Sequence, residues 1–148
     1  MAGVSSEELA VRTAAAEAKA HAGDFRGAAS EFRTLARDHV REVGADDPRT
    51  LGVRLMLTKV LGTAKQFRKA VEVCEPLLDD LVRVHGPEHD EVLETRQLLA
   101  NLRYQAGDPE GAAQELELLR SALARVLVPT HDRITKVKRD IAFLQNSR

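Results

Sequence analysis

The sequence repeats itself every 42 residues, and this period constrains the fold more than any other feature. The segment AGDFRGAA at 22–29 returns 42 residues later as AKQFRKAV at 64–71, and after another 42 as AGDPEGAA at 106–113. A second marker keeps the same spacing: GADDPRTL begins at Gly44, GPEHDEVL at Gly86 and VPTHDRIT at Val128. A fixed period of this length is typical of solenoids, in which each repeat forms one supersecondary unit.

Both markers have the composition of links between helices. The first is short and contains Gly or Asp, which predicts a tight turn with Asp24 and Asp108 as N-caps, while the second joins one helix pair to the next. The predicted helices lie near 5–22, 24–42, 47–63, 66–84, 89–105, 108–126 and 131–146. We therefore expect an all-α fold in a single domain, 1–148, with repeats at about 5–43, 47–85 and 89–127 and a C-terminal capping helix at 131–146.

Apolar residues between the markers recur at helical spacing in matching positions of each repeat, as a continuous core requires. In the first helices the expected core positions are Val11, Val53, Thr95 and Val137; Ala15, Leu57, Leu99 and Ile141; and Ala18, Val60, Leu102 and Leu144. In the second helices they are Ala28, Ala70 and Ala112; Phe32, Cys74 and Leu116; and Leu35, Leu77 and Leu119. The small residue in the first of these sets allows two helices to approach closely.

The stretch GPEHDEVLETRQLLANLRYQAGDPEGA, from Gly86 to Ala112, resembles the tetratricopeptide repeat in its kinesin light chain-like, 42-residue form. The resemblance covers nearly the whole chain. It implies a right-handed superhelical solenoid of three antiparallel helix pairs plus the capping helix, and a protein- or peptide-binding scaffold whose first helices line a concave groove. Similar arrays also occur beside kinase and transcription-regulator domains in actinobacteria. A self-associating or regulatory domain of a bacterial signalling system, with a possible homodimer, is therefore the alternative.

Transferred by repeat register, the resemblance gives a candidate groove that contains cations, amides and aromatic rings. Its expected residues are Lys59, Gln97, Asn101, Tyr104, Lys136, Arg139 and Phe143, with Glu17 at the far end. Phe143 lies opposite the apolar stripe of the last helix and beside cations, although a single exposed aromatic residue on a solvated face would show the same pattern. We expect an acidic segment with one large apolar residue as the ligand.

Catalysis, cofactors and nucleic acid find little support in the sequence. The formal net charge is −1, and we find no phosphate-binding Gly-rich loop, no nucleophile elbow and no His-Glu-x-x-His helix. Hence we expect no enzyme, no cofactor, no nucleic-acid or membrane partner, and a cytoplasmic location. His85 and His89 could hold a metal, but solvated loop residues are the simpler interpretation.

Two further features have alternative readings. Cys74 occupies a core position, which favours a buried apolar role over a reactive thiol. Arg12, Arg54, Arg96 and Lys138 recur in register, either as a basic stripe for ligands or as side chains that pack between helices and pair with carboxylates.

Overall fold

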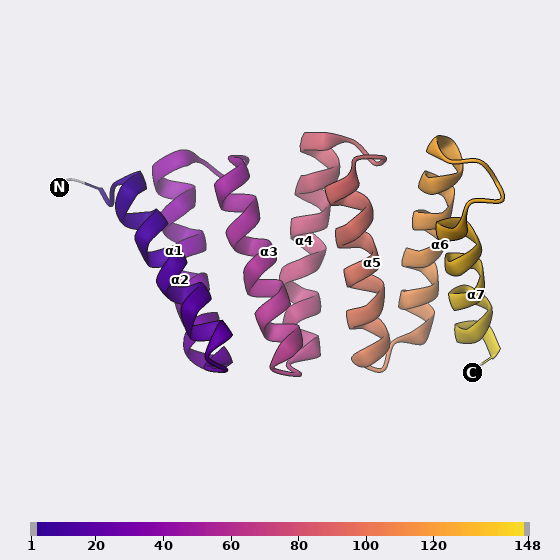
Figure 1. Cartoon of the computed structure of the whole chain (residues 1–148), viewed down its shortest axis with the longest axis horizontal. Coiled ribbons are helices and arrows are strands. Elements are labelled where there is room, and N and C mark those ends of the chain that lie inside the picture. The colour runs from indigo at the N-terminus through magenta and orange to yellow at the C-terminus, as the bar shows by residue number, and fades with distance from the viewer. Residues whose placement is uncertain (1–2, 147–148) are drawn as a thin grey trace. The chain divides into compact units, whose positions relative to one another are not determined.

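The computed structural model describes residues 3–146, and the helices in this range follow the predicted order (Figure 1). They are α1 (Ser6–His21), α2 (Phe25–Val43), α3 (Pro48–Thr63), α4 (Phe67–His85), α5 (Asp90–Gln105), α6 (Pro109–Val126) and α7 (Asp132–Asn146). Each helix begins and ends within one residue of its predicted bounds. The prediction of an all-α fold of successive helix pairs is confirmed.

Side-chain caps explain why the helices begin where they do. Asp24 accepts a hydrogen bond from the backbone N–H of Gly27, and Asp108 accepts one from that of Gly111, each at 2.9 Å. Ser5 accepts from the N–H of Glu8 at 3.1 Å. These bonds satisfy backbone donors that have no partner within the first turn of a helix. The N-caps predicted at Asp24 and Asp108 are therefore confirmed.

The tight turn within each pair needs one residue with a left-handed backbone. Gly23 and Gly107 occupy this position with φ values of 87° and 86°. The middle repeat places Lys65 there, with φ of 61°. A residue with a Cβ is strained in this region, whereas glycine is not. The middle turn thus keeps the geometry of the other two with a less suitable residue.

The chain divides into two compact units, one ending at Leu77 and one beginning at Leu78. In the N-terminal unit, α2 packs against both α1 and α3, and adjacent helices run in opposite directions (Figure 1). Phe32, Leu35 and Cys74 are fully buried there, which confirms the core role predicted for the cysteine.

In the C-terminal unit, α6 packs against both α5 and α7. The buried cluster joins Leu93 and Ala100 of α5 to the apolar face of α6, and α7 adds Val137 and Ile141. The last helix therefore covers an apolar face of α6, as the capping-helix prediction requires.

The core positions predicted in α1 are wrong. Val11 is 70% exposed, and Ala15 and Ala18 are also exposed, while Leu9 and Ala16 are buried instead. The register equivalents in α3, which are Val53, Leu57 and Val60, are all buried. The difference arises because α3 packs against α2 of the preceding pair, whereas within residues 3–146 no helix precedes α1. The α1 edge, defined as Val11, Ala15 and Ala18, is thus an exposed apolar stripe.

The strained turn gives a direct prediction about stability. Replacing Lys65 with glycine should increase the free energy of unfolding by about 1 kcal/mol, because it removes the cost of a Cβ in a left-handed conformation. Lys59→Gly is the matched control: the same chemical change inside α3 should lower stability by about 1 kcal/mol. Urea denaturation followed by circular dichroism measures both. Equal losses for the two variants would contradict the assignment of strain to Lys65.

Candidate functional site

The candidate groove residues lie on first helices and on α7, as their register predicted. Lys59 lies on α3; Gln97, Asn101 and Tyr104 on α5; and Lys136, Arg139 and Phe143 on α7. Six of these residues therefore belong to the C-terminal unit and Lys59 to the N-terminal unit.

Gln97, Asn101 and Lys136 come together in one crevice of the C-terminal unit. We define the C-terminal crevice as the space of about 330 Å³ lined by Leu93, Glu94, Gln97, Asn101, Leu119, Leu123, Arg133, Lys136 and Val137. The Gln97 amide donates to the Asn101 side-chain oxygen at 3.1 Å, so the two amides form a continuous polar strip along α5. Amide groups of this kind can hydrogen-bond the backbone of a bound peptide.

Tyr104 and Phe143 form an aromatic pair next to this strip. Their ring centroids are 6.2 Å apart in an edge-to-face arrangement, and the side chains are 43% and 58% exposed. Both residues, together with Asn101, line a second hollow of about 180 Å³. Because Asn101 borders both spaces, the polar strip and the aromatic pair lie on one continuous surface. A pair of exposed rings is an unusually apolar feature for a solvated helix face.

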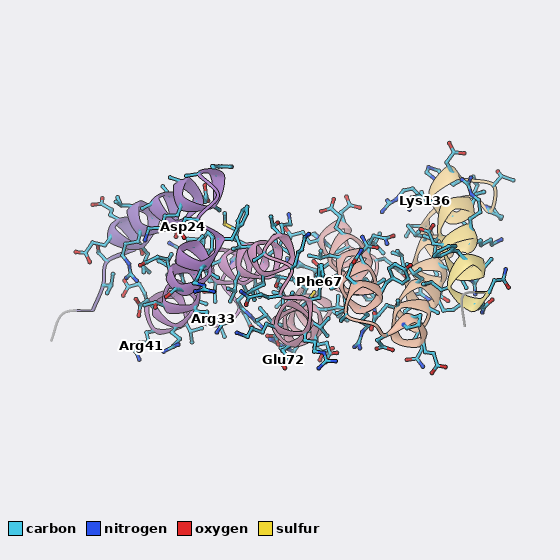
Figure 2. The ribbon with its side chains drawn as sticks, turned by 90° about the horizontal axis from the view of Figure 1, so that it is seen from below. Asp24, Arg33, Arg41, Phe67, Glu72 and Lys136 are labelled. Carbon is cyan, nitrogen blue, oxygen red and sulfur yellow. The ribbon has the colours of Figure 1, made fainter. Side chains whose placement is uncertain are left out.

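The charges around the C-terminal crevice are more balanced than the sequence suggested. Lys136 extends from α7 into solvent (Figure 2) and pairs with Asp140 at 2.8 Å. Arg133 adds a second cation, but Glu94 of α5 also borders the crevice. An exposed i,i+4 pair contributes little to stability, so the Lys136 ammonium can exchange Asp140 for a ligand carboxylate at low cost.

Two of the predicted groove residues do not line this surface. Arg139 is exposed on α7 but borders neither the crevice nor the aromatic hollow. Lys59 is exposed on α3 in the other unit. Arg139 and Lys59 occupy the expected repeat positions, but the cations that line the C-terminal crevice are Arg133 and Lys136.

The two histidines between α4 and α5 have a structural role. The rings of His85 and His89 stack with centroids 4.2 Å apart, and Nδ1 of His89 accepts from the backbone N–H of Glu91 at 3.2 Å. His89 is therefore the N-cap of α5. Within residues 3–146, no group of three or more His, Cys, Asp or Glu side chains is arranged to hold a metal ion.

The basic residues that recur in register contribute to packing in at least two repeats. Arg12 of α1 donates to Asp38 of α2 at 2.8 Å, and Arg96 of α5 donates to Glu115 of α6 at 3.0 Å. Both pairs are partly buried and join the two helices of a repeat. Lys138 is exposed on α7. For Arg12 and Arg96, pairing between helices therefore accounts for the pattern.

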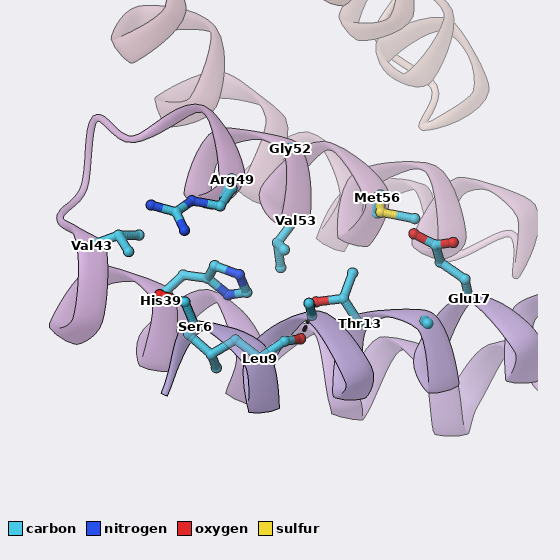
Figure 3. Close-up of a pocket in the computed structure, with 12 residues that line it drawn as sticks. Ser6, Leu9, Thr13, Glu17, His39, Val43, Arg49, Gly52, Val53 and Met56 are labelled. Carbon is cyan, nitrogen blue, oxygen red and sulfur yellow. Dashed lines mark hydrogen bonds between the residues drawn. The ribbon is translucent and has the colours of Figure 1, made fainter. Parts of the chain in front are cut away.

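The N-terminal unit has a further hollow that was not predicted from the sequence. We define the N-terminal pocket as the space of about 510 Å³ between α1, α2 and α3 (Figure 3), lined by Ser6, Leu9, Ala10, Thr13, Ala14, Glu17, His39, Val43, Arg49, Gly52, Val53 and Met56. Glu17 and Met56 lie toward one end and Arg49 toward the other. Shifting this set by two periods, or 84 residues, gives most of the C-terminal crevice: Leu9 corresponds to Leu93 and Val53 to Val137. The repeat register was the signal that could have found it.

A local hydrogen-bond network fixes one rim of the N-terminal pocket. Asp47, the N-cap of α3, accepts from the Arg49 guanidinium at 2.9 and 3.0 Å and from the Arg49 backbone N–H at 2.9 Å. The guanidinium bonds, followed by the backbone bond, lower the pKa of Asp47 from 3.8 to about 2. The same pairing raises the pKa of Arg49. Arg49 is thus held by its own helix terminus.

Comparison with solved structures shows the class of fold. The nearly identical TPR-like repeats of Podosopora anserina, assigned to a kinesin light chain, match with a TM-score of 0.85 and 19% identity over 97% of this chain and 68% of theirs. BtubC (BKLC) from P. vanneervenii matches with a TM-score of 0.78 and 13% identity over 95% of this chain and 56% of its own. PcrH from Pseudomonas aeruginosa matches with a TM-score of 0.64 and 15% identity over 97% and 96%.

These matches confirm the resemblance found in the sequence. The chain has a tetratricopeptide-like repeat fold, and its structural neighbours include kinesin light chain-like repeats. No protein-family model matches the sequence, and no curated protein matches it significantly. Within the described residues, every helix is too short or too polar to cross a membrane.

The Asp47–Arg49 network predicts a specific pH dependence. Because the folded-state pKa of Asp47 is depressed, its stabilising contribution is fully present above about pH 3.8 and is lost as the pH falls through about 2. Arg49→Gln should raise the pKa of Asp47 toward 3.8, and the remaining backbone bond should keep it from reaching that value. A carboxyl carbon NMR titration measures this shift. The control is Arg26→Gln, at the opposite end of α2, which should leave the Asp47 titration unchanged.

Proposed function

We propose that the chain is a non-catalytic protein- or peptide-binding scaffold whose ligand lies across α5 and α7. The observation that carries this proposal is the continuous surface that joins the Gln97–Asn101 amides to the exposed Tyr104–Phe143 pair. Amides suit the polar backbone of an extended segment, and exposed rings suit a large apolar side chain. Such a mixture of aromatic anchors and a polar rim is characteristic of recognition surfaces.

The preferred ligand is an acidic segment with one apolar anchor. Arg133 and Lys136 line the crevice, and Arg139 is a further exposed cation of the same helix outside it. Glu94 and Asp140 oppose them, which makes the electrostatic preference moderate. The anchor would contact the Tyr104 and Phe143 rings, where burial of apolar surface supplies most of the binding free energy.

A second candidate function, self-association, is favoured by the exposed apolar stripe of the α1 edge. Glu8 near the start of α1 and Lys19 near its end are both exposed and lie along one side of this stripe. In an antiparallel pair of α1 helices from two copies, each Glu8 carboxylate would approach the partner's ammonium at Lys19 while Val11, Ala15 and Ala18 are buried. Lys19 already has a weak pair with Glu31 at 3.7 Å, which the dimer could exchange.

Peptide binding can be tested with synthetic ligands. Peptides rich in Asp and Glu with a central Phe should bind more tightly than the same peptides with Ala, as measured by fluorescence anisotropy. The double variant Lys136→Glu, Arg139→Glu should weaken binding roughly tenfold, which is about 1.4 kcal/mol, and should flatten its salt dependence. The double variant Lys69→Glu, Lys138→Glu changes the net charge equally and should bind normally. Equal affinities for all three proteins would place the binding surface elsewhere.

Self-association has a separate readout. Sedimentation equilibrium of the full chain should show a dimer at micromolar concentrations, and Val11→Lys should yield a monomer with an unchanged melting temperature, because Val11 is already exposed in the single chain. Val126→Lys, at another exposed valine, is the control and should remain dimeric. A wild-type chain that is monomeric at all concentrations would rule this candidate out.

A further inference from the structure

The N-terminal pocket and the C-terminal crevice occupy equivalent positions but differ in their side chains. Where the crevice has Glu94 and Lys136, the pocket has Ala10 and Gly52. A Cβ added to Gly52 would meet no heavy atom within 4 Å, so this glycine leaves open space rather than accommodating a neighbour. Replacing two long charged side chains with these small residues opens a larger and more apolar space from the same helix arrangement.

His39 gives this apolar space one side chain that can form a hydrogen bond with a ligand. The residue is 4% exposed, and its ring projects from α2 toward Val53 and Leu9 (Figure 3). Nδ1 lies 2.7 Å from the carbonyl oxygen of Leu35, and since a carbonyl can only accept, Nδ1 carries the proton. With a proton on Nδ1, Nε2 is the ring nitrogen left to accept a hydrogen bond. Within residues 3–146, the structure gives Nε2 no hydrogen-bond partner.

The fold itself does not require a nitrogen at this position. The equivalent residue of the C-terminal unit is Leu123, which is 1% exposed and fills the same place with an apolar side chain. Because His39 lines the N-terminal pocket, a donor that enters the pocket can reach its ring. Two other polar side chains of the pocket are already engaged: Thr13 donates to the carbonyl of Leu9 at 2.8 Å, and Arg49 pairs with Asp47.

We propose that the N-terminal pocket binds a neutral phenolic ring, inserted with its hydroxyl toward His39. The ring would pack between Leu9, Val53 and Met56, and its hydroxyl would donate to Nε2. A phenol suits this arrangement because its donor lies at the far end of a flat apolar body. A cationic donor would lose its hydration against apolar walls, and an anionic ligand would meet the carboxylate of Glu17 at the rim. The ring can belong to a small molecule or to a tyrosine side chain.

This site is distinct from the peptide surface on α5 and α7, so the two proposals can fail independently. The probes are p-cresol and 4-methylanisole, which differ by a methyl group on the oxygen and hence in the donor. Titration of the full chain, followed by NMR of the Met56 methyl and the His39 ring, should show p-cresol binding at least ten times more tightly than 4-methylanisole. Equal affinities, or no shift at these two residues up to millimolar p-cresol, would overturn the proposal.

Three variants locate the site and its donor recognition. Gly52→Leu should fold normally, because its side chain enters open space, and should abolish p-cresol binding. Lys136→Leu is the matched control at the equivalent position of the C-terminal crevice and should bind p-cresol like the wild type. His39→Leu introduces the side chain found at Leu123 and should remove the preference for p-cresol over 4-methylanisole. Retained p-cresol binding in Gly52→Leu would overturn the assignment of the pocket.

The source of the ring is distinguished by a further pair of probes. Tighter binding of N-acetyltyrosinamide than of p-cresol would identify a protein side chain as the ligand, because the added peptide groups would then contribute to affinity. Tighter binding of p-cresol would identify a small phenol, since the backbone atoms would then be excluded. Both outcomes support a phenol site. If p-cresol and N-acetyltyrosinamide did not compete with each other for binding, they would occupy different sites, and the proposal would be contradicted.

Discussion

The packing of α1 against α2 and of α5 against α6 depends on a small side chain at one repeat position. Ala28, Ala70 and Ala112 recur at the period of 42, and all three are at most 1% exposed. A larger residue at such a position would force neighbouring side chains out of their preferred rotamers or shift the backbone. The larger core residues of the second helices, such as Phe32 and Leu116, reach their partners because the helices are this close. The walls of the pocket and the crevice follow from that spacing.

Most of the fold could be predicted because its determinants are local and repeated. Asp24 and Asp108 announce helix starts through their own side chains, and the period transfers each boundary to the next repeat. The errors fall on residues whose burial requires a neighbouring helix that is not present beside every repeat. Val11 has the register of a core residue, but its burial requires a preceding helix, and none lies within the described residues.

The candidate site was only partly predictable for a related reason. Gln97, Asn101 and Lys136 line one crevice because their repeat positions bring them together from α5 and α7, and their role in binding stays a prediction. The N-terminal pocket was missed since it arises from missing side chains at Ala10 and Gly52 and from His39, which belongs to a second helix. A search for functional groups in a sequence does not detect positions where a long side chain is replaced by a small one. Comparing equivalent positions of the repeats, one against another, would have exposed it.

The unbroken spacing of the markers has a consequence for how such a chain can change over time. Successive residues of an α-helix are rotated by about 100°, so inserting one residue within a helix turns every later side chain of that helix away from its partner. Length changes are therefore tolerated best in exposed links such as Val128–Thr130, between α6 and α7. Inside the repeats, new binding properties must therefore arise from substitutions that leave the length of each helix unchanged. The exchange of Lys136 for Gly52 at equivalent positions illustrates this route: copies of one scaffold acquire different chemistry while their geometry is inherited unchanged.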